Sequence, residues 1–90
     1  MSLTSRQLER VVKGFASHRR IDILILLDKS PELSVEEIAD KLSIGYENAS
    51  DHLRKMTISG LVLKRSDGKS VRHKLTKRAK DVLTFCKTLE

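Results

Sequence analysis

The sequence has 90 residues, of which 39% are hydrophobic and 33% are charged, and its formal net charge is +6. This length and composition indicate one globular domain, residues 1–90, rather than a disordered chain, and an enzyme-sized cleft is not expected. The longest apolar run, residues 21–27, is interrupted by Asp22 and is too short to span a bilayer, and no signal peptide opens the chain. We therefore expect a soluble cytoplasmic protein with no membrane partner.

The excess positive charge lies in the last third of the chain. Residues 1–60 carry nine Lys or Arg and nine Asp or Glu, whereas residues 61–90 carry nine and three. The basic residues between Lys64 and Lys80 are opposed, within that segment, only by Asp67. Such a segment predicts contact with a polyanion, and a simply solvated surface is the alternative for any run of charge.

The first two expected helices differ in how much of their surface is apolar. Residues 4–15 predict an amphipathic helix, whose apolar stripe consists of Leu8, Val11, Val12 and Phe15. In residues 18–29, isoleucine and leucine leave almost no polar side. We expect this second helix to be the central core helix, buried all round, and to end at Ser30 and Pro31.

The next segment predicts two helices joined by a short turn. Ser34 and Glu37 have the spacing of a capping box, which begins a third helix of about two turns. Residues 43–46 then contain a glycine and have the length typical of a helix-turn-helix. The fourth helix, residues 46–59, places Ala49, Leu53 and Met56 on one face, so the opposite face is presented to solvent.

After Gly60 the hydrophobic period changes from helical to two. Residues 61–75 predict a two-stranded ribbon whose turn lies at Asp67 and Gly68. Thr76 is positioned to cap a last helix with an apolar stripe. The order of elements predicts a mainly α fold with a β-hairpin: a winged helix-turn-helix with three helices, a recognition helix, a two-stranded wing and a C-terminal helix.

Five segments in the same order resemble the arsenic-repressor (ArsR) type of transcriptional regulator. They are Phe-Ala-Ser-His-Arg-Arg-Ile at 15–21, Leu-Ser-Val-Glu-Glu-Ile-Ala at 33–39, Ala-Ser-Asp-His-Leu at 49–53, Ser-Gly-Leu-Val at 59–62 and Val-Arg-His-Lys-Leu-Thr at 71–76. The resemblance covers nearly the whole chain. It implies a homodimer that binds a pseudo-palindromic operator in double-stranded DNA, with the fourth helix in the major groove and the hairpin tip on the neighbouring backbone or minor groove.

The residues that we expect to face DNA lie on the fourth helix and the hairpin. They are Tyr46, Glu47, Asn48, Ser50, Asp51 and Arg54 on the helix, and Lys64, Arg65, Lys69 and Arg72 in the hairpin. We expect the near-neutral helix to read base edges, with Asn48 suited to adenine and Arg54 to guanine or a phosphate, while the basic hairpin attracts phosphates.

Glu47 and Asp51 depart from the family pattern, because carboxylates on a groove-facing surface repel DNA. Each could accept a hydrogen bond from cytosine. We favour local roles instead: Glu47 as a first-turn residue that suits the helix dipole, and Asp51 as an ion-pair partner of Lys55 one turn later.

The residues do not form a metal or catalytic motif. Where metal-binding relatives carry a Cys-x-Cys, this sequence has Ser34-Val35-Glu36, and the three histidines, His18, His52 and His73, fall on three different elements. We expect packing or surface roles for the histidines. Cys86 has no second cysteine to form a disulfide with, and we favour a small core or interface residue over a sensor thiol. The sequence therefore predicts no metal, no cofactor and no enzyme activity.

Dimerisation is expected through the helices at the two ends of the chain, because so short a chain leaves their apolar stripes partly uncovered. The residues concerned are Leu8, Val11, Val12 and Phe15 in the first helix and Val82, Phe85, Cys86 and Leu89 in the last. A winged helix used only for protein interaction, without DNA binding, remains the alternative function.

Overall fold

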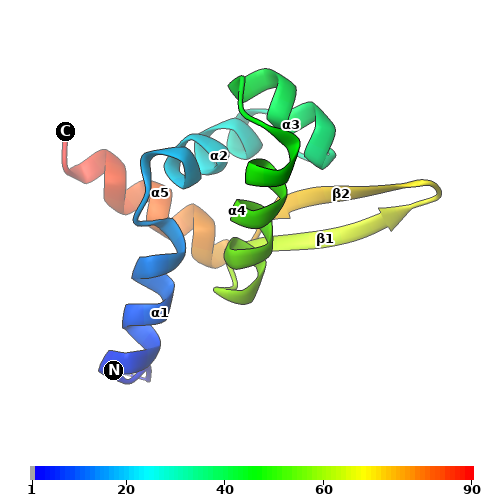
Figure 1. Cartoon of the computed structure of the whole chain (residues 1–90). Coiled ribbons are helices and arrows are strands. Elements are labelled where there is room, and N and C mark those ends of the chain that lie inside the picture. The colour runs from blue at the N-terminus through cyan, green and yellow to red at the C-terminus, as the bar shows by residue number, and fades with distance from the viewer. Residues whose placement is uncertain (1) are drawn as a thin grey trace.

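The computed structural model describes residues 2–90, which form five helices and one two-stranded hairpin (Figure 1). In chain order the elements are α1 (Ser5–Phe15), α2 (His18–Lys29), α3 (Val35–Leu42), α4 (Tyr46–Ile58), β1 (Val62–Asp67), β2 (Ser70–Leu75) and α5 (Lys77–Thr88). The expected winged helix-turn-helix order is confirmed, and the hairpin of β1 and β2 is called the wing below. In the described part of the chain, no helix is long and apolar enough to cross a membrane.

Four of the helices begin at a serine or threonine whose side chain accepts a hydrogen bond from a backbone N–H of the first turn. These residues are Thr4, Ser17, Ser34 and Thr76. Ser34 and Glu37 form the expected capping box, in which Ser34 N donates to Glu37 Oε1 at 3.0 Å and Glu37 N to Ser34 Oγ at 3.2 Å. Such caps satisfy backbone donors that have no partner within the helix, so the sequence itself marks where each helix starts.

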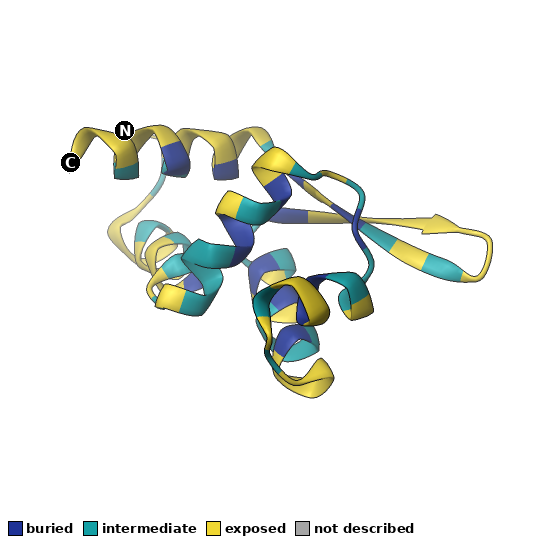
Figure 2. Cartoon of the chain, turned by 90° about the horizontal axis from the view of Figure 1, so that it is seen from above, coloured by how far each residue is buried: buried dark blue, intermediate teal, exposed yellow. Residues whose placement is uncertain are grey.

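The hydrophobic core is built around α2 but does not enclose it. Ile23, Leu24 and Leu27 are buried, whereas Ile25 is 43% exposed and Ile21 is half-buried. Figure 2 shows that buried, intermediate and exposed positions alternate along the helices of the domain. The expectation that α2 is buried all round is therefore wrong. A domain of 90 residues has too few neighbouring elements to cover every side of a central helix, so one side of α2 stays in contact with water.

Val11 and Phe15 of α1 pack against this core as partly buried side chains, and the fully buried side chains around α2 come from the other elements and the segments that join them. They are Leu33, Ile38, Leu53, Met56, Leu61, Val62, Leu75, Ala79 and Leu83. The turn between α3 and α4 is compact: Ser43 adopts a left-handed conformation at φ 54°, and Gly45 is the N-cap of α4. The buried faces of α3 and α4 thus share one core, which fixes the helix-turn-helix as a unit.

The wing projects away from the helices (Figure 1). Its strands pair antiparallel from Val62 opposite Leu75 to Asp67 opposite Ser70, and Gly68 in the turn has φ 60°. At the root of the wing, His73 N donates to Leu33 O at 2.9 Å and Glu32 N donates to His73 O at 2.9 Å. The segment before α3 therefore pairs with β2 and anchors the wing to the helix-turn-helix.

Helix α1 crosses the end of α4 at a very short distance. A Cβ added to Gly14 would lie 2.3 Å from Ser59 Oγ, which real structures do not tolerate. Ser59 Oγ lies 3.3 Å from the carbonyl oxygen of Arg10 and 3.0 Å from that of Lys55, and its one proton is shared between these two acceptors. Glycine at position 14 is thus required by the close approach of α1 to α4.

Candidate nucleic-acid interface

Helix α4 is anchored on one side and exposed on the other. Ala49, Leu53 and Met56 are buried in the core, and at 3.6 residues per turn the opposite side carries Glu47, Asp51, Arg54 and Ile58. At the start of the helix, the Tyr46 side chain is 59% exposed. The division of α4 into a packed and a presented face agrees with the sequence prediction.

The presented face is less acidic than its sequence implies, because Asp51 is bound by its own neighbours. Arg54 Nη2 lies 2.7 Å from Asp51 Oδ1 and Lys55 Nζ lies 3.0 Å from Oδ2. The hydrogen bond from Arg54, followed by that from Lys55, lowers the pKa of Asp51 to about 2. The predicted local role of Asp51 is confirmed, and the three side chains together carry one positive charge.

The other predicted groove residues occupy different positions on α4. Asn48 is exposed and unobstructed by any ion pair, Glu47 lies in the first turn as expected from the helix dipole, and Ser50 is half-buried on the flank of the helix. Asn48 and Glu47 are thus the exposed members of this group, and Asn48 is the uncharged one.

The basic residues of the wing fall into two groups. Arg65 donates to Glu32 Oε2 from Nε at 3.2 Å and from Nη2 at 3.0 Å, which raises the pKa of Arg65. Lys64 and Lys69 are exposed and take part in no ion pair among residues 2–90. Asp67 is the only acidic residue within the basic segment, as the sequence shows, but Glu32 and Glu37 from outside the segment also pair with its arginines.

Arg72 is the most heavily bonded of the wing cations. Its Nη1 lies 3.0 Å from Glu37 Oε1 and donates to the carbonyl oxygen of Glu32 at 3.2 Å, and its Nε lies 3.5 Å from Asp67 Oδ2. Hydrogen bonds from Ser34, together with the charge of Arg72, lower the pKa of Glu37. Because Glu37 also caps α3, a single carboxylate joins the wing to the first helix of the helix-turn-helix.

Two histidines have defined hydrogen bonds. His73 is buried at the wing root with Nδ1 2.9 Å from the carbonyl oxygen of Leu33, and burial lowers its pKa. His52 on α4 accepts a hydrogen bond at Nδ1 from Arg20 Nε at 3.0 Å, and burial, followed by the charge of Arg20, lowers its pKa. His18 is exposed, so each of the three has a packing or surface position.

The apolar residues expected at a dimer interface lie on the side of the molecule opposite the wing (Figure 1). Val12, Phe85 and Leu89 are exposed, with Phe85 at 55% and Leu89 at 70%. Those that are half-buried are Leu8, Val11, Phe15, Val82 and Cys86. Both terminal helices therefore keep apolar surface that this chain alone does not cover.

The ligand-forming residues do not gather into a metal centre. Over residues 2–90, no group of three or more His, Cys, Asp or Glu side chains is placed to hold an ion. Ser34, Val35 and Glu36 lie at the beginning of α3, with Ser34 used as its cap.

Long-range ion pairs are the part of the site that sequence reasoning missed. Glu32 and Glu37 are separated from their arginine partners by 33 and 35 residues, so no local spacing reports the contact. The contact of Arg20 with His52 spans 32 residues. By contrast, the Asp51 to Lys55 pair was readable from its spacing of one helical turn.

The paired helices α3 and α4, followed by a projecting hairpin, define a winged helix-turn-helix domain. The sequence profile of the family described as "Bacterial regulatory protein, arsR family" matches residues 17–64, from the cap of α2 into β1. This match covers more than half of the chain, and the protein belongs to that family. No curated protein matches the sequence.

Solved structures agree with this assignment along nearly the whole chain. HlyU from Vibrio cholerae is 31% identical, with 99% of this chain and 97% of that chain covered and a TM-score of 0.81. A homodimeric winged helix-turn-helix DNA-binding domain from Mycobacterium bovis, a possible ArsR-family transcriptional regulator, is 26% identical, with 99% and 88% covered and a TM-score of 0.84. NolR from Sinorhizobium fredii, at 21% identity, 99% and 95% coverage and a TM-score of 0.85, shares the fold.

Proposed function

We propose that the protein is a homodimeric transcriptional regulator of the bacterial cytoplasm that recognises a specific sequence in double-stranded DNA. The observation that carries the proposal is the geometry of α4, a helix fixed by three buried side chains and presenting its opposite face beside a basic wing. The similar domain from Mycobacterium bovis is described as homodimeric and DNA-binding, which supports the same assembly here.

We assign different roles to the site residues according to the hydrogen bonds and ion pairs that each makes. Asn48 and Tyr46 are exposed at the start of α4 and are assigned to base edges and the adjacent backbone, and Arg54 is shared between Asp51 and DNA. Lys64 and Lys69 are assigned to phosphates. Arg65 and Arg72, which are bound to Glu32 and Glu37, orient the wing and contribute less to phosphate attraction than their charge implies.

Dimerisation is assigned to the terminal helices. The exposed side chains of Val12, Phe85 and Leu89 lie on helices α1 and α5, and covering them across a two-fold axis removes apolar surface from water. Phe85→Asp is expected to convert the dimer to a monomer in sedimentation at micromolar concentration, and Thr84→Asp, one residue earlier and also exposed, is the control. A wild-type protein that sediments as a monomer contradicts this part of the proposal.

The Asp51 ion pairs weaken the main argument for a module that binds only proteins. Two carboxylates on the presented face oppose DNA binding, but one of them is already neutralised by Arg54 and Lys55. We also propose that the protein acts without a bound metal, since the segment that resembles the Cys-x-Cys site of metal-binding relatives holds Ser34, Val35 and Glu36 instead.

The salt dependence of DNA affinity tests the proposed interface. If a dimer makes about six phosphate contacts, log affinity falls against log salt with a slope of about −5. The double variant Lys64→Ala/Lys69→Ala removes up to four contacts per dimer and is expected to flatten the slope by about 3 to 4 for every DNA sequence. The matched control, Lys29→Ala/Lys80→Ala, removes the same charge from α2 and α5. Equal affinity of the wing variant and the wild type for random DNA at every salt concentration favours the protein-interaction module.

Sequence discrimination is expected to reside in α4. Asn48→Ala is expected to cost about 1 to 3 kcal/mol on an operator selected from genomic fragments, and nothing on random DNA. Gel shifts with both DNAs measure the difference. A uniform loss on both would move Asn48 from the base-reading set to the backbone-contacting set.

A further inference from the structure

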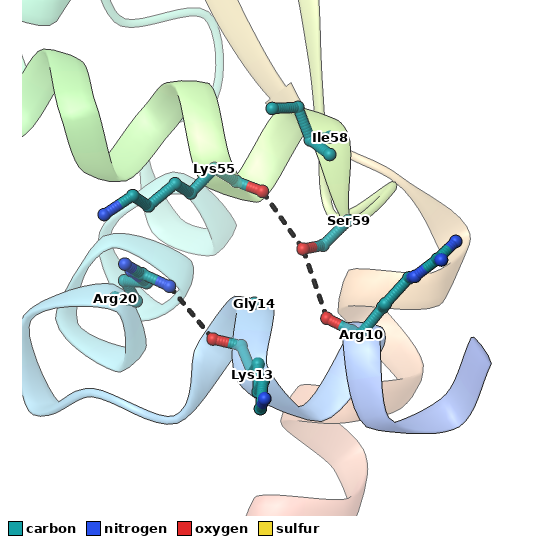
Figure 3. Close-up of a pocket in the computed structure, with 7 residues that line it drawn as sticks. All are labelled: Arg10, Lys13, Gly14, Arg20, Lys55, Ile58 and Ser59. Atoms are coloured by element: carbon teal, nitrogen blue, oxygen red, sulfur yellow. Dashed lines mark hydrogen bonds between the residues drawn. The ribbon is translucent and has the colours of Figure 1, made fainter. Parts of the chain in front are cut away.

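A cavity of about 260 Å³ lies where α1 crosses the end of α4, and it is called the α1–α4 pocket below (Figure 3). Its lining residues are Arg10, Lys13, Gly14, Arg20, Lys55, Ile58 and Ser59. They come from α1, α2 and the end of α4, so the pocket joins the first helix to the end of the recognition helix.

The wall of the pocket that faces solvent is almost entirely apolar. Ile58, whose side chain is 75% exposed, stands at the rim, and Gly14 brings α1 close to Ser59 (Figure 3). The hydroxyl of Ser59 is already bonded to the carbonyl oxygens of Arg10 and Lys55. Because the polar groups where the two helices cross bond to one another, the surface that remains open to solvent consists mainly of carbon atoms, including the methylene groups of the basic side chains.

The charges around this apolar surface are all positive. Four of the seven lining residues are Arg or Lys and none is acidic. Lys13 and Lys55 have ion-pair partners on their own helices, Glu9 at 3.9 Å and Asp51 at 3.0 Å. Within residues 2–90, Arg10 and Arg20 take part in no ion pair.

Arg20 is the most informative of these cations. It is half-buried, and its hydrogen bonds go to two neutral acceptors, the carbonyl oxygen of Lys13 at 2.9 Å and His52 Nδ1 at 3.0 Å (Figure 3 shows the first). Arg72 is also half-buried, but its guanidinium pairs with carboxylates instead. A partly buried guanidinium whose own chain supplies no counterion favours an anion beside it.

We propose that the α1–α4 pocket binds a small organic anion, a carboxylate joined to a flat apolar body. The carboxylate pairs with Arg20, whose guanidinium lies on the same side of the pocket as Lys55, and the body covers Ile58 and the wall between the two helices (Figure 3). A phosphate, including one of a DNA backbone, would neutralise the charge of Arg20 but leave the apolar wall exposed to water. A neutral apolar molecule would cover the wall but leave Arg20 without a counterion.

Occupation of this pocket is expected to weaken DNA binding, an expectation that rests on the proposed function. An anion beside Lys55 competes with Asp51 for that ammonium group, which leaves the Asp51 carboxylate less neutralised on the presented face of α4. The anion also lowers the positive potential at the end of the helix. By linkage, DNA must weaken the binding of the anion by the same factor.

Amide NMR titration of the full chain with three probes tests the pocket. Naphthoate supplies charge and apolar body, naphthamide the body alone and acetate the charge alone. We expect naphthoate to give saturable shifts at the amides of Gly14, Ile58 and Ser59, and the other two probes to bind about tenfold or more weakly. Acetate or naphthamide binding as tightly as naphthoate, or shifts spread over all basic surfaces without saturation, would overturn the proposal.

Matched variants locate the binding. Ile58→Glu and Arg20→Gln are expected to weaken naphthoate binding by about fivefold or more, whereas Ile25→Glu on α2 and Arg6→Gln on α1 make the same changes outside the pocket and are expected to leave it unchanged. Equal losses in the control variants contradict the assigned site.

A DNA titration with saturating naphthoate tests the coupling, with a loss of about fivefold or more in affinity expected for the wild type and none for Ile58→Glu. Unchanged affinity overturns the coupling. Because the NMR titration contains no DNA, a protein that binds naphthoate and not DNA would refute the proposed function and leave the pocket standing.

Discussion

Helix α4 and the wing share one hydrophobic core, but the wing depends in addition on ion pairs, although both are proposed to contact the same DNA. Ala49, Leu53 and Met56 hold α4 by burial in the core, an interaction that salt and pH hardly alter. The wing shares this core through Val62 and Leu75 at its root, but it also depends on the buried His73 and on ion pairs of Arg65 and Arg72 with acidic residues outside it. The orientation of the wing, unlike that of α4, should therefore respond to solution conditions.

Removing a core contact of α4 should have the largest effect. Leu53→Ala deletes a side chain that is 1% exposed and is expected to cost about 2 to 5 kcal/mol of unfolding free energy, measured by urea denaturation. Ile58→Ala on the same helix is the control, since its side chain is mostly exposed and its loss is expected to cost less than about 0.5 kcal/mol. Similar losses in the two variants would mean that burial does not position α4.

Acidification should act on the wing root, with an effect smaller than the loss of a core side chain. Burial lowers the pKa of His73 below its ordinary value of 6.5. When the pH falls below 6.5, this histidine therefore binds a proton in the unfolded chain before it does so in the folded chain. Stability is therefore complete above about pH 6.5 and falls as the pH drops below it.

The pH dependence can be assigned to this histidine by substitution. His73→Phe, with a side chain of similar shape that does not titrate, is expected to reduce the fall in unfolding free energy between neutral and mildly acidic pH. His52, whose pKa is also lowered, accounts for the remainder. His18→Gln removes an exposed histidine and serves as the control. An unchanged pH profile in His73→Phe would show that the wing root does not respond to protonation.

Weakening the ion pair between the wing and α3 should have the smallest effect on stability. Glu37→Gln retains a side chain able to complete the capping box and removes the charge that Arg72 meets. Because this pair is partly exposed, the expected loss of unfolding free energy is smaller than that caused by acidification, and it decreases as salt rises. NMR relaxation of the wing amides is expected to show increased motion in Glu37→Gln. Glu36→Gln, one residue earlier and exposed, is the matched control.

What could be predicted from the sequence follows the distinction between local and long-range order. Helix starts at Ser34 and Thr76, the turn at Gly68 and the buried face of α4 all depend on residues within one or two turns of each other, and each was predicted. The exposure of Ile25 could not be predicted, because the hydrophobic pattern of a helix does not show how many other elements pack around that helix.

The site was predictable only in part for the same reason. The pairing of Asp51 with Lys55 follows from helical spacing, whereas the partners of Arg65 and Arg72 depend on where the segment before α3 meets β2. That meeting is a tertiary contact, specified by the packing of the whole domain. The α1–α4 pocket escaped prediction as well, since it arises from the crossing of two helices more than 40 residues apart.

The glycine at that crossing also sets a distance beyond the single chain. Gly14 lets α1 lie directly against Ser59 at the end of α4, so the position of one helix fixes that of the other. In the proposed dimer, α1 belongs to the interface and α4 to the DNA, and the separation between the two copies of α4 is then determined by this contact and its symmetry mate. Gly14 thus helps to set the spacing between the two halves of an operator, although it has no side chain with which to contact the DNA or the partner subunit.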